Sequence, residues 1–561
     1  MIRRSYSGHP ASGGTALGVL HRTDRPLATV VLPRRSAGDP VQEVTGAFDA
    51  VAGQLIALST TLREQGKDEQ ADIMEVNGYI ALDEDLRGQA VERTRQGLPS
   101  SVAVRQAIDT YAAVIGSLDD PTLAERAADV RQVGRRVLAH LHGDTGPLPD
   151  QPLVLAAHEI GAADLLEPGQ TVIAAVSVTG GPNSHAAIIA RSLGIPLLLA
   201  VDPRFLELPD GQEVLLDTEG AAAVTHPDEQ ERAAALAAMD AARSLRATLA
   251  KERHLPAETL DGQRVTLRAN VATPTETRRA LEANAEGVGL LRTELPFLNA
   301  RTWPTRSQHA AAIGPVLRAL EGQVVVARTL DFADDKLPPF LADGNGEQRL
   351  GRGLPYMLAE PEAFADQFRS LLASGSGTDL RIMIPMVADV HEFRACRRLL
   401  AAAADELGVF APPLGVMVEL PEAVAAVDDL AREASFLSIG SNDLTSQILG
   451  MDRRDPAATP ALAAHPAVLR AIAQVVTAAR RHHRHVSVCG DAAAHPLVTP
   501  LLVGLGCDSL SVSPAVLDEV RARIRRLSHQ TCADVAATAL SRESAEDVWE
   551  LVRQHCLPSL P

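Results

Sequence analysis

The sequence lacks any apolar run as long as the roughly 18 residues that a membrane-spanning helix needs. Its first residues, MIRRSYSGHPASGG, also lack the apolar centre of a secretory signal peptide. Aromatic residues make up only 3% of the chain, which argues against an all-β protein and favours the Ala-rich composition of helical and α/β proteins. We therefore expect a cytoplasmic protein that does not insert into a membrane.

Cysteine is also scarce, and its spacing shows no metal-binding pattern. The five cysteines are scattered, without a CxxC pair, at Cys396, Cys489, Cys507, Cys532 and Cys556. Such spacing is typical of reduced thiols in a cytosolic protein and argues against a disulfide framework. A small buried residue is the default interpretation of each of them, unless the fold places one at a site.

Positive charge is in deficit. The chain has 53 Lys and Arg residues against 71 Asp and Glu, a net charge of -18, and its pI is near 5.4. Nucleic acids and anionic membranes would repel such a chain, so neither is expected as its main partner. A basic protein partner is compatible with this charge.

The first half of the chain combines two patterns. Residues 1–30 and 145–228 contain short strand-like runs with glycine and proline breaks, such as PLVLAAHE and TVIAAVSV. Between them, residues 31–144 carry apolar residues at three- and four-residue spacing, which predicts a bundle of about four helices. The helical block is therefore expected as an insert within one small α/β domain.

The second half changes rhythm. Residues 229–255 are charged and Ala-rich, which predicts a helical linker. From residue 256 to residue 561, eight short apolar runs, from RVTLRANV to SLSVS, alternate with helical segments. Because the chain has 561 residues and 46% hydrophobic content, two or three domains are expected, and this stretch predicts a (β/α)8 barrel. A doubly wound open sheet is the alternative.

Nearly every one of the eight apolar runs ends in polar residues. These strand ends carry Asn270, Arg292-Thr293-Glu294, Arg328-Thr329-Leu330-Asp331, Glu419, Asn442-Asp443 and Cys489-Gly490-Asp491. In a barrel the chemistry lies at the carboxyl ends of the strands, so these side chains are expected at one site. Arginines bind phosphate and carboxylate, and Glu419 and Asp443 suit Mg2+. The set predicts a small, doubly anionic phosphorylated substrate, whereas a single arginine could equally form a structural salt bridge.

A second candidate site precedes the linker. The stretch GGPNSHAAIIARSLGIP places His185 after a Gly-Gly turn and before an apolar run that predicts a helix. A neutral imidazole is a competent nucleophile near pH 7, and glycines at 180 and 181 allow a phosphate to approach the backbone. The N-terminus of such a helix would attract an anion. Taken alone, such a motif is more often a surface histidine after a turn.

These residues together resemble a family. GGPNSHAAIIARSLGIP, VVVARTLDFADDK, LRIMIPMV, LGVMVELPEA, FLSIGSNDLT and VSVCGD occur in the order found in the enzyme I family of phosphoenolpyruvate-dependent sugar phosphotransferase systems. The resemblance runs nearly end to end. It implies that His185 accepts the phosphoryl group of phosphoenolpyruvate and passes it to a histidine of the carrier protein HPr. It also implies that Arg191 holds the phosphoryl group on the histidine.

The resemblance also implies functions for the barrel residues. The side chains that match substrate contacts in the family are Arg292, Arg328, Lys336, Asn442 and Arg453. Glu419 and Asp443 match the ligands of Mg2+, and Cys489 matches the general acid that protonates the pyruvate enolate. The helical insert is similar to the HPr-binding subdomain, the linker to a hinge, and a homodimer through the barrel is expected.

The chain departs from the family pattern at several positions near the expected chemistry. They include Gly161, Asn183, Ala186, Asp334 and Pro355, where relatives carry hydroxyl, glycine or arginine residues. These departures leave the nucleophile, the metal ligands and the general acid in place. Those around His185 and Lys336 nevertheless motivate an alternative, an altered paralogue with a regulatory or binding function. A pyruvate phosphate dikinase or phosphoenolpyruvate synthase is less favoured, since no nucleotide-binding domain precedes His185. The carrier could also belong to a nitrogen-type or dihydroxyacetone-kinase phosphorelay.

Overall fold

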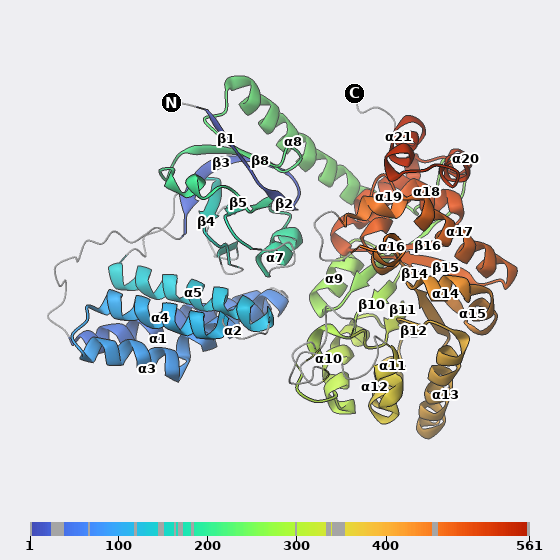
Figure 1. Cartoon of the computed structure of the whole chain (residues 1–561), viewed down its shortest axis with the longest axis horizontal. Helices are drawn as coiled ribbons and strands as arrows, with labels where there is room; N and C mark the ends of the chain where they lie inside the picture. Colours follow the sequence, from blue (N-terminus) through green and yellow to red (C-terminus); the bar gives the residue numbers. More distant parts are fainter. Residues whose placement is uncertain are drawn as a thin grey trace. The chain divides into compact units, whose positions relative to one another are not determined.

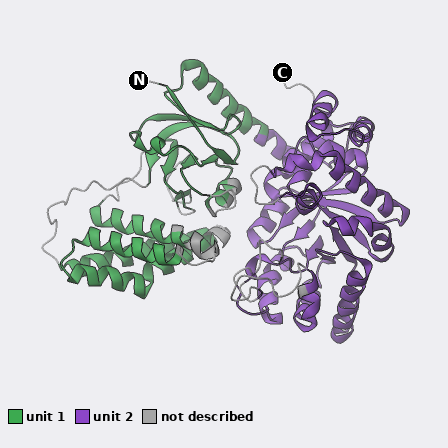
Figure 2. Ribbon diagram, viewed as in Figure 1, with its two compact units in different colours: residues 1–245 green, residues 246–561 purple. Residues whose placement is uncertain are grey.

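The computed structural model divides the chain into two compact units, residues 1–245 and residues 246–561 (Figure 2). The boundary falls inside helix α8 (Glu229–Lys251), within the stretch expected as a linker. The finer division of the first unit into domains stays a prediction. The structure describes residues 3–23, 39–64, 68–116, 121–143, 151–161, 164–165, 172–180, 185–297, 300–332, 338, 341, 354–451 and 458–557.

The first unit contains a mixed eight-stranded sheet in the order β1-β8-β7-β3-β4-β5-β6-β2 (Figure 1). Its strands are β1 (Arg4–Ser7), β2 (His9–Ser12), β3 (Thr15–Arg22), β4 (Leu153–Ala157), β5 (Val172–Ser177), β6 (Leu197–Leu199), β7 (Glu213–Asp217) and β8 (Ala222–Thr225). Strands β3 to β6 run parallel, whereas the other pairs are antiparallel. Helix α7 (His185–Leu193) lies between β5 and β6 in the chain.

The residues between β3 and β4 form a helical bundle. Its helices are α1 (Pro40–Glu64), α2 (Asp68–Leu82), α3 (Glu84–Arg95), α4 (Ser100–Gly116) and α5 (Pro121–His142). The helical pattern of residues 69–97 is divided at Asp83 into α2 and α3, which adds one helix to the four expected. The Asp83 carboxylate accepts a hydrogen bond from the backbone N–H of Leu86 (2.8 Å) and thereby caps α3, so the described bundle has five helices rather than four.

The second unit is a closed barrel of eight parallel strands, which confirms the predicted architecture (Figure 1). The strands are β9 (Thr266–Val271), β10 (Val288–Leu291), β11 (Val324–Arg328), β12 (Asp379–Ile384), β13 (Leu414–Val418), β14 (Phe436–Gly440), β15 (His485–Cys489) and β16 (Ser509–Val512). Pairing of β16 with β9 closes the ring. The open-sheet alternative is therefore wrong.

Helices surround this barrel, and between them and the strands lies the largest hydrophobic core. They are α9 (Pro274–Glu282), α10 (Arg306–Ala319), α11 (Leu354–Ala359), α12 (Pro361–Ser374), α13 (Val390–Leu407), α14 (Pro421–Ala425), α15 (Val427–Glu433), α16 (Ser441–Leu449), α17 (Pro466–Arg481), α18 (Thr499–Leu505), α19 (Leu517–Arg526), α20 (His529–Ala539) and α21 (Ala545–His555). A smaller apolar cluster fills the barrel lumen, formed by Leu290, Val326, Met383, Met417, Phe436 and Cys489. None of the described helices has the length and apolar character to cross a membrane.

A histidine is buried without a hydrogen bond in the barrel unit. His309 of α10 is fully buried against Phe297, with ring centroids 4.9 Å apart, and neither ring nitrogen has a partner in the described part of the chain. Burial lowers the pKa of His309 from 6.5 to about 4, because the charged imidazolium would lose its hydration. The unfolded chain therefore binds a proton here at a pH where the folded barrel does not.

We expect this difference to reduce stability as the pH falls from about 6.5 towards 4, by about 2 kcal/mol at pH 5. The substitution His309→Leu should remove that part of the loss between pH 7 and pH 5. Both tryptophans, Trp303 and Trp549, belong to the barrel unit, so urea unfolding followed by tryptophan fluorescence reports on it. His391→Leu, at an exposed position of α13, is the control. An unchanged pH dependence in His309→Leu would contradict the assignment.

Candidate active site

Polar side chains gather at the carboxyl edge of the barrel. Arg328 is the last residue of β11, Glu419 directly follows β13, and Cys489 is the last residue of β15. All three are buried, with 5%, 1% and 2% of their surface exposed. Because parallel strands of a barrel end at the same edge, the three side chains face a common site.

Arg328 is held between two buried carboxylates. Its Nη2 donates to Oε1 of Glu294 (2.6 Å), and its Nη1 lies 2.8 Å from Oδ2 of Asp331. Burial alone lowers the pKa of Arg328, but the charges of Asp331 and Glu294 outweigh it and leave that pKa raised. The guanidinium is therefore permanently charged and fixed in position at the end of β11.

Glu419 has one satisfied and one free oxygen. Its Oε1 accepts a hydrogen bond from the backbone N–H of Met386 (2.6 Å), whereas Oε2 is buried without a partner among the described residues. Met386 has a φ of 54°, a left-handed conformation that costs energy in a residue other than glycine and is common at functional sites. Burial raises the pKa of Glu419 well above its usual value, and the nearby charges of Asp331 and Asp443 add to this rise.

The surroundings of Glu419 suit a divalent cation. A Cβ atom at Gly440 would lie 2.8 Å from Oε2 of Glu419, so only glycine leaves room there. Asp443 follows in the first turn of α16. Within the described ranges no cluster of three or more His, Cys, Asp or Glu side chains could enclose a metal ion. The unpartnered Oε2 of Glu419 and the nearby Asp443 carboxylate fit Mg2+, which completes its coordination with water and substrate phosphate.

Cys489 lies on the lumen side of the same edge. Its thiol donates a hydrogen bond to the backbone carbonyl of Ile439 (3.5 Å). The Ser438 hydroxyl donates one to the sulfur (3.6 Å). Burial raises the pKa of Cys489 to about 11. The charge of Arg328 acts against this rise, and the charge of Glu419 adds to it. The sulfur therefore carries a proton at neutral pH and can act as an acid.

Asn442 is oriented by the loop that follows Cys489. Its Nδ2 donates to Oδ2 of Asp491 (3.1 Å), and its Oδ1 accepts from the backbone N–H of Asp491 (3.1 Å). Gly490 precedes Asp491 in this loop, with a φ of +103° and no room for a Cβ atom beside Oδ1 of Asn442 (2.8 Å). Glycine at this position therefore lets the loop approach the first turn of α16 and hold the Asn442 amide at the edge of the barrel.

Arg292 is the most accessible of the described arginines expected at the substrate. It follows β10, its side chain is 36% exposed, and its Nη2 lies 3.7 Å from Oε1 of Glu276. Its Nε is buried and has no hydrogen-bond partner in the described chain. The guanidinium is thus only loosely held and can reorient towards a ligand.

A buried amide that the sequence interpretation missed ties the ends of β10 and β11 together. Gln367 of α12 donates from Nε2 to Oγ1 of Thr293 (2.9 Å) and accepts from the backbone N–H of Leu330 (3.0 Å). Thr293 in turn donates to the backbone carbonyl of Arg328 (2.7 Å). The fully buried Gln367 therefore positions both loops that carry the site's arginines.

The remaining expected residues are placed less completely. Lys336 and Arg453 lie outside the described residues. His185 is the first residue of α7, and Arg191 belongs to the same helix in the first unit. The structure describes the backbone of these two residues only, so their proposed functions stay predictions.

Two of the departures from the family pattern have a structural basis. A Cβ atom at Gly161 would overlap the side chain of Gln132 on α5, so the glycine accommodates a buried glutamine of the bundle. Ala186 is 5% exposed and packs in the core that α7 shares with the sheet and the bundle. Pro355 is exposed at the start of α11. The other two departures, at positions 183 and 334, lie outside the described residues.

Family models match almost the whole chain. Residues 246–529 match the PEP-binding domain of PEP-utilising enzymes, residues 7–126 their N-terminal domain, and residues 149–220 their mobile domain. Among solved structures, the N-terminal domain of Enzyme 1 - Nitrogen is 27% identical over 40% of this chain and 94% of that one. Its TM-score of 0.30 is too low to bear on the fold.

Curated relatives agree with these models. A multiphosphoryl transfer protein of Xanthomonas campestris pv. campestris is 35% identical over 98% of this chain, which spans only 66% of that relative's length. The phosphoenolpyruvate-protein phosphotransferases of Bacillus sp. (strain S) and Bacillus subtilis (strain 168) are each 30% identical over 98% of this chain, and 98% and 99% of their own lengths are covered. The chain therefore belongs to the PEP-utilising enzymes and, among them, to the phosphoenolpyruvate-protein phosphotransferase family.

Proposed function

We propose that this enzyme transfers the phosphoryl group of phosphoenolpyruvate to His185 and then to a histidine of an HPr-type carrier protein, with release of pyruvate. One observation carries the proposal: the barrel edge holds the arginines, the paired carboxylates and the protonated thiol that this reaction requires, in a chain that belongs to the corresponding family. The regulatory alternative has no specific observation in its favour, because the described chemical groups are all intact.

The arginines neutralise the substrate. Arg328 is fixed by Glu294 and Asp331, whereas Arg292 is free to reorient, so one guanidinium provides a rigid contact and the other an adjustable one. Guanidinium groups bind phosphate and carboxylate oxygens in pairs of parallel hydrogen bonds. Together with Asn442 they would hold the phosphate and the carboxylate of phosphoenolpyruvate, and Lys336 and Arg453 would add to them.

Glu419 and Asp443 would hold Mg2+ through carboxylate oxygens, one of which is the unpartnered Oε2 of Glu419. The ion, when bound, neutralises phosphate charge as the phosphoryl group is transferred. The two carboxylates also repel each other and the buried Asp331. Burial is the larger cause of the raised pKa of Glu419, and this repulsion is the next. A dication at this place removes that repulsion.

In the transfer itself, an imidazole nitrogen of His185 forms a bond to phosphorus while the bond between phosphorus and the enol oxygen breaks. The electron pair remains on the enolate, whose methylene carbon takes a proton from Sγ of Cys489 to give pyruvate. A thiol with a pKa of about 11 retains that proton until the basic enolate forms. Because His185 and the barrel belong to different units, we further propose that α8 acts as a hinge.

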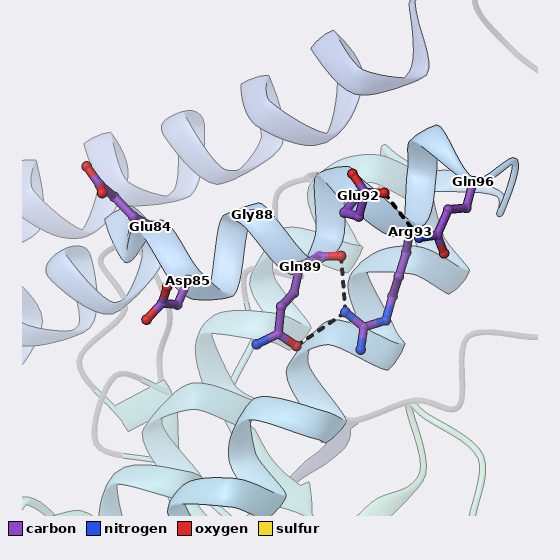
Figure 3. A pocket seen from close by; sticks show the side chains of 7 residues that line it. All are labelled: Glu84, Asp85, Gly88, Gln89, Glu92, Arg93 and Gln96. Carbon is purple, nitrogen blue, oxygen red and sulfur yellow. Dashed lines mark hydrogen bonds between the residues drawn. The ribbon is translucent and has the colours of Figure 1, made fainter.

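The helical bundle is the proposed docking site for the carrier. Apolar side chains are exposed on α1 and α2, namely Ile56, Val76, Tyr79 and Leu82. The next helix adds negative charge, because Glu84, Asp85 and Glu92 line a shallow hollow along α3 (Figure 3). An apolar patch beside carboxylates fits a carrier whose contact surface is basic and partly apolar, and the charge also speeds association.

Two further properties remain part of the proposal. We place the enzyme in the cytoplasm, a reducing compartment suited to its five buried cysteines, all of which are free thiols. A homodimer through the barrel is expected by membership of the family. Neither property changes the chemistry derived above.

The first test uses the purified chain with Mg2+ and radiolabelled phosphoenolpyruvate. We expect acid-labile, base-stable label on the wild type and on His158→Ala, a control at an exposed histidine of the same unit, and none on His185→Ala. Absence of label from a folded wild type would exclude the enzymatic function and favour the regulatory alternative. Equal label on all three proteins would show that the nucleophile is a residue other than His185.

A second test concerns the metal ligands. Glu419→Gln keeps an oxygen that can accept from the Met386 N–H but removes the negative charge, so the barrel should fold and bind Mn2+ more than tenfold more weakly, as measured by electron paramagnetic resonance. Phosphorylation of His185 should fall in parallel, and excess EDTA should abolish it in the wild type. Glu422→Gln, at an exposed position of α14, should leave both unchanged. Wild-type Mn2+ affinity in Glu419→Gln would rule out this carboxylate as a ligand.

A third test concerns Gln367. Gln367→Met preserves the volume of the side chain but removes both hydrogen bonds to the loops that carry the arginines. We expect the rate of His185 phosphorylation to fall at least tenfold, since loosely held arginines stabilise the transferred charge less well. Ser370→Ala, on the same helix at a buried hydroxyl without a described partner, is the control for packing. If both variants lose activity equally, Gln367 serves only to pack α12.

A further inference from the structure

The lumen of the barrel carries cations at its amino-terminal end, away from the site described above. Arg268 of β9 is in register with Ser511, and Ser511 with Cys489, so Arg268 faces the lumen as Cys489 does. Arg381 of β12 is in register with Val326 of the lumen cluster, and His485 of β15 with Phe436. Three basic side chains thus enter the lumen from three different strands.

These residues precede the apolar lumen cluster along their strands. Arg381 comes two residues before Met383, and His485 comes four residues before Cys489. The loops at this end of the barrel continue the basic character, because residues 480–485 read RRHHRH. The apolar cluster therefore separates the basic end of the lumen from the edge that holds Arg328 and Glu419.

Several donors at this end have no acceptor. Nε of Arg268, Nε of Arg381 and Oγ of Ser509 are all buried without a hydrogen-bond partner, and every connection at this end of the barrel lies within the described residues. Arg268 as a whole is only 9% exposed, and Ser509 only 1%. A buried donor without an acceptor costs free energy, so a native structure normally supplies one.

The nearby carboxylates already accept hydrogen bonds, one of them from Arg381 itself. Asp379 accepts from Nη2 of Arg381 (2.9 Å), and Asp508 accepts from the backbone N–H of Val486 (2.7 Å). Glu286 accepts from Arg264 (2.6 Å) and from the backbone N–H of Leu267 (3.1 Å). Among the described residues no hydrogen bond satisfies the Arg268 guanidinium, so its acceptor must come from solvent or from a ligand.

The basic groups also repel one another. Burial lowers the pKa of Arg268, and the charge of Arg381 lowers it further, against smaller opposite effects of Asp379 and Glu286. Burial likewise lowers the pKa of His485, where Asp508 acts in the opposite direction and both arginines add to the lowering. An anion placed among these groups would reverse the repulsion and accept the free hydrogen bonds.

We propose that the amino-terminal mouth of the barrel is a second ligand site, which binds a small oxyanion through Arg268, Arg381 and Ser509. The ligand is a phosphate or a carboxylate, because guanidinium groups pair with either through two oxygens. It is small, since the lumen beyond is closed by the apolar cluster. The site is independent of the phosphoryl transfer proposed above, and its ligand need not be a substrate.

The test measures the thermal unfolding of the full-length chain by tryptophan fluorescence at constant ionic strength, with inorganic phosphate in one series and malonate in another. The wild type should be stabilised by at least one of the two anions. Arg268→Met should lose that part of the stabilisation, with at least tenfold weaker binding of the anion in equilibrium dialysis. Arg481→Gln, at an exposed arginine at the same end that pairs with Asp428, removes the same charge and should behave as the wild type.

Anions that bind at the Arg328 edge affect all three proteins equally, so the difference between Arg268→Met and Arg481→Gln reports on the mouth alone. Phosphorylation of His185 is not measured, and failure of the transfer proposal leaves this test unaffected. Should Arg268→Met fail to fold, Ser509→Ala, which removes only a hydroxyl, takes its place. Equal stabilisation of wild type, Arg268→Met and Arg481→Gln by both anions would overturn the proposal, as would the absence of stabilisation in the wild type.

Discussion

A buried guanidinium needs negative charge beside it, and the carboxyl edge of the barrel is arranged around this requirement of Arg328. Moving an unpaired ion out of water costs several kcal/mol, which Glu294 and Asp331 offset by direct contact. The two carboxylates come from the loops after β10 and β11, so satisfying the cation also fixes both loops. Glu419 then lies near other negative charges and is suited to a metal ion. The position of the Arg328 guanidinium and the positions of the carboxylates Glu294 and Asp331 are thus fixed together.

Much of this edge could be predicted because parallel strands of a barrel all end on the same side. The sequence shows where each apolar run stops, and the residues that follow, such as Arg328, Glu419 and Cys489, must then meet whatever the details of packing. The closed barrel itself followed from eight runs with helical segments between them. The helix boundary at Asp83 was missed, since a single capping side chain decides it.

Other parts of the site depend on tertiary contacts that no strand pattern specifies. Gln367 occupies a core position of α12, between Phe364 and Leu371, and a polar residue at such a position was the available signal. Its partners, however, lie in two loops whose conformation only the folded barrel determines. The position of the Arg268 side chain could not be predicted either. The strand pattern points to the carboxyl edge of the barrel, whereas this side chain lies in the lumen towards the amino-terminal end. The fit of Gly161 against Gln132 also requires the packing of two separate segments.

The barrel closes where its first strand pairs with its last. Asn270 of β9 donates to the carbonyl of Ser511 in β16, 241 positions further along the chain. Contacts over such a distance form late, because closing a long loop is entropically costly before other contacts support it. During synthesis the first unit can therefore fold while the barrel is still incomplete. Both ends of the lumen form only once β16 has left the ribosome, and a chain interrupted earlier would contain the first unit with His185 but no closed barrel.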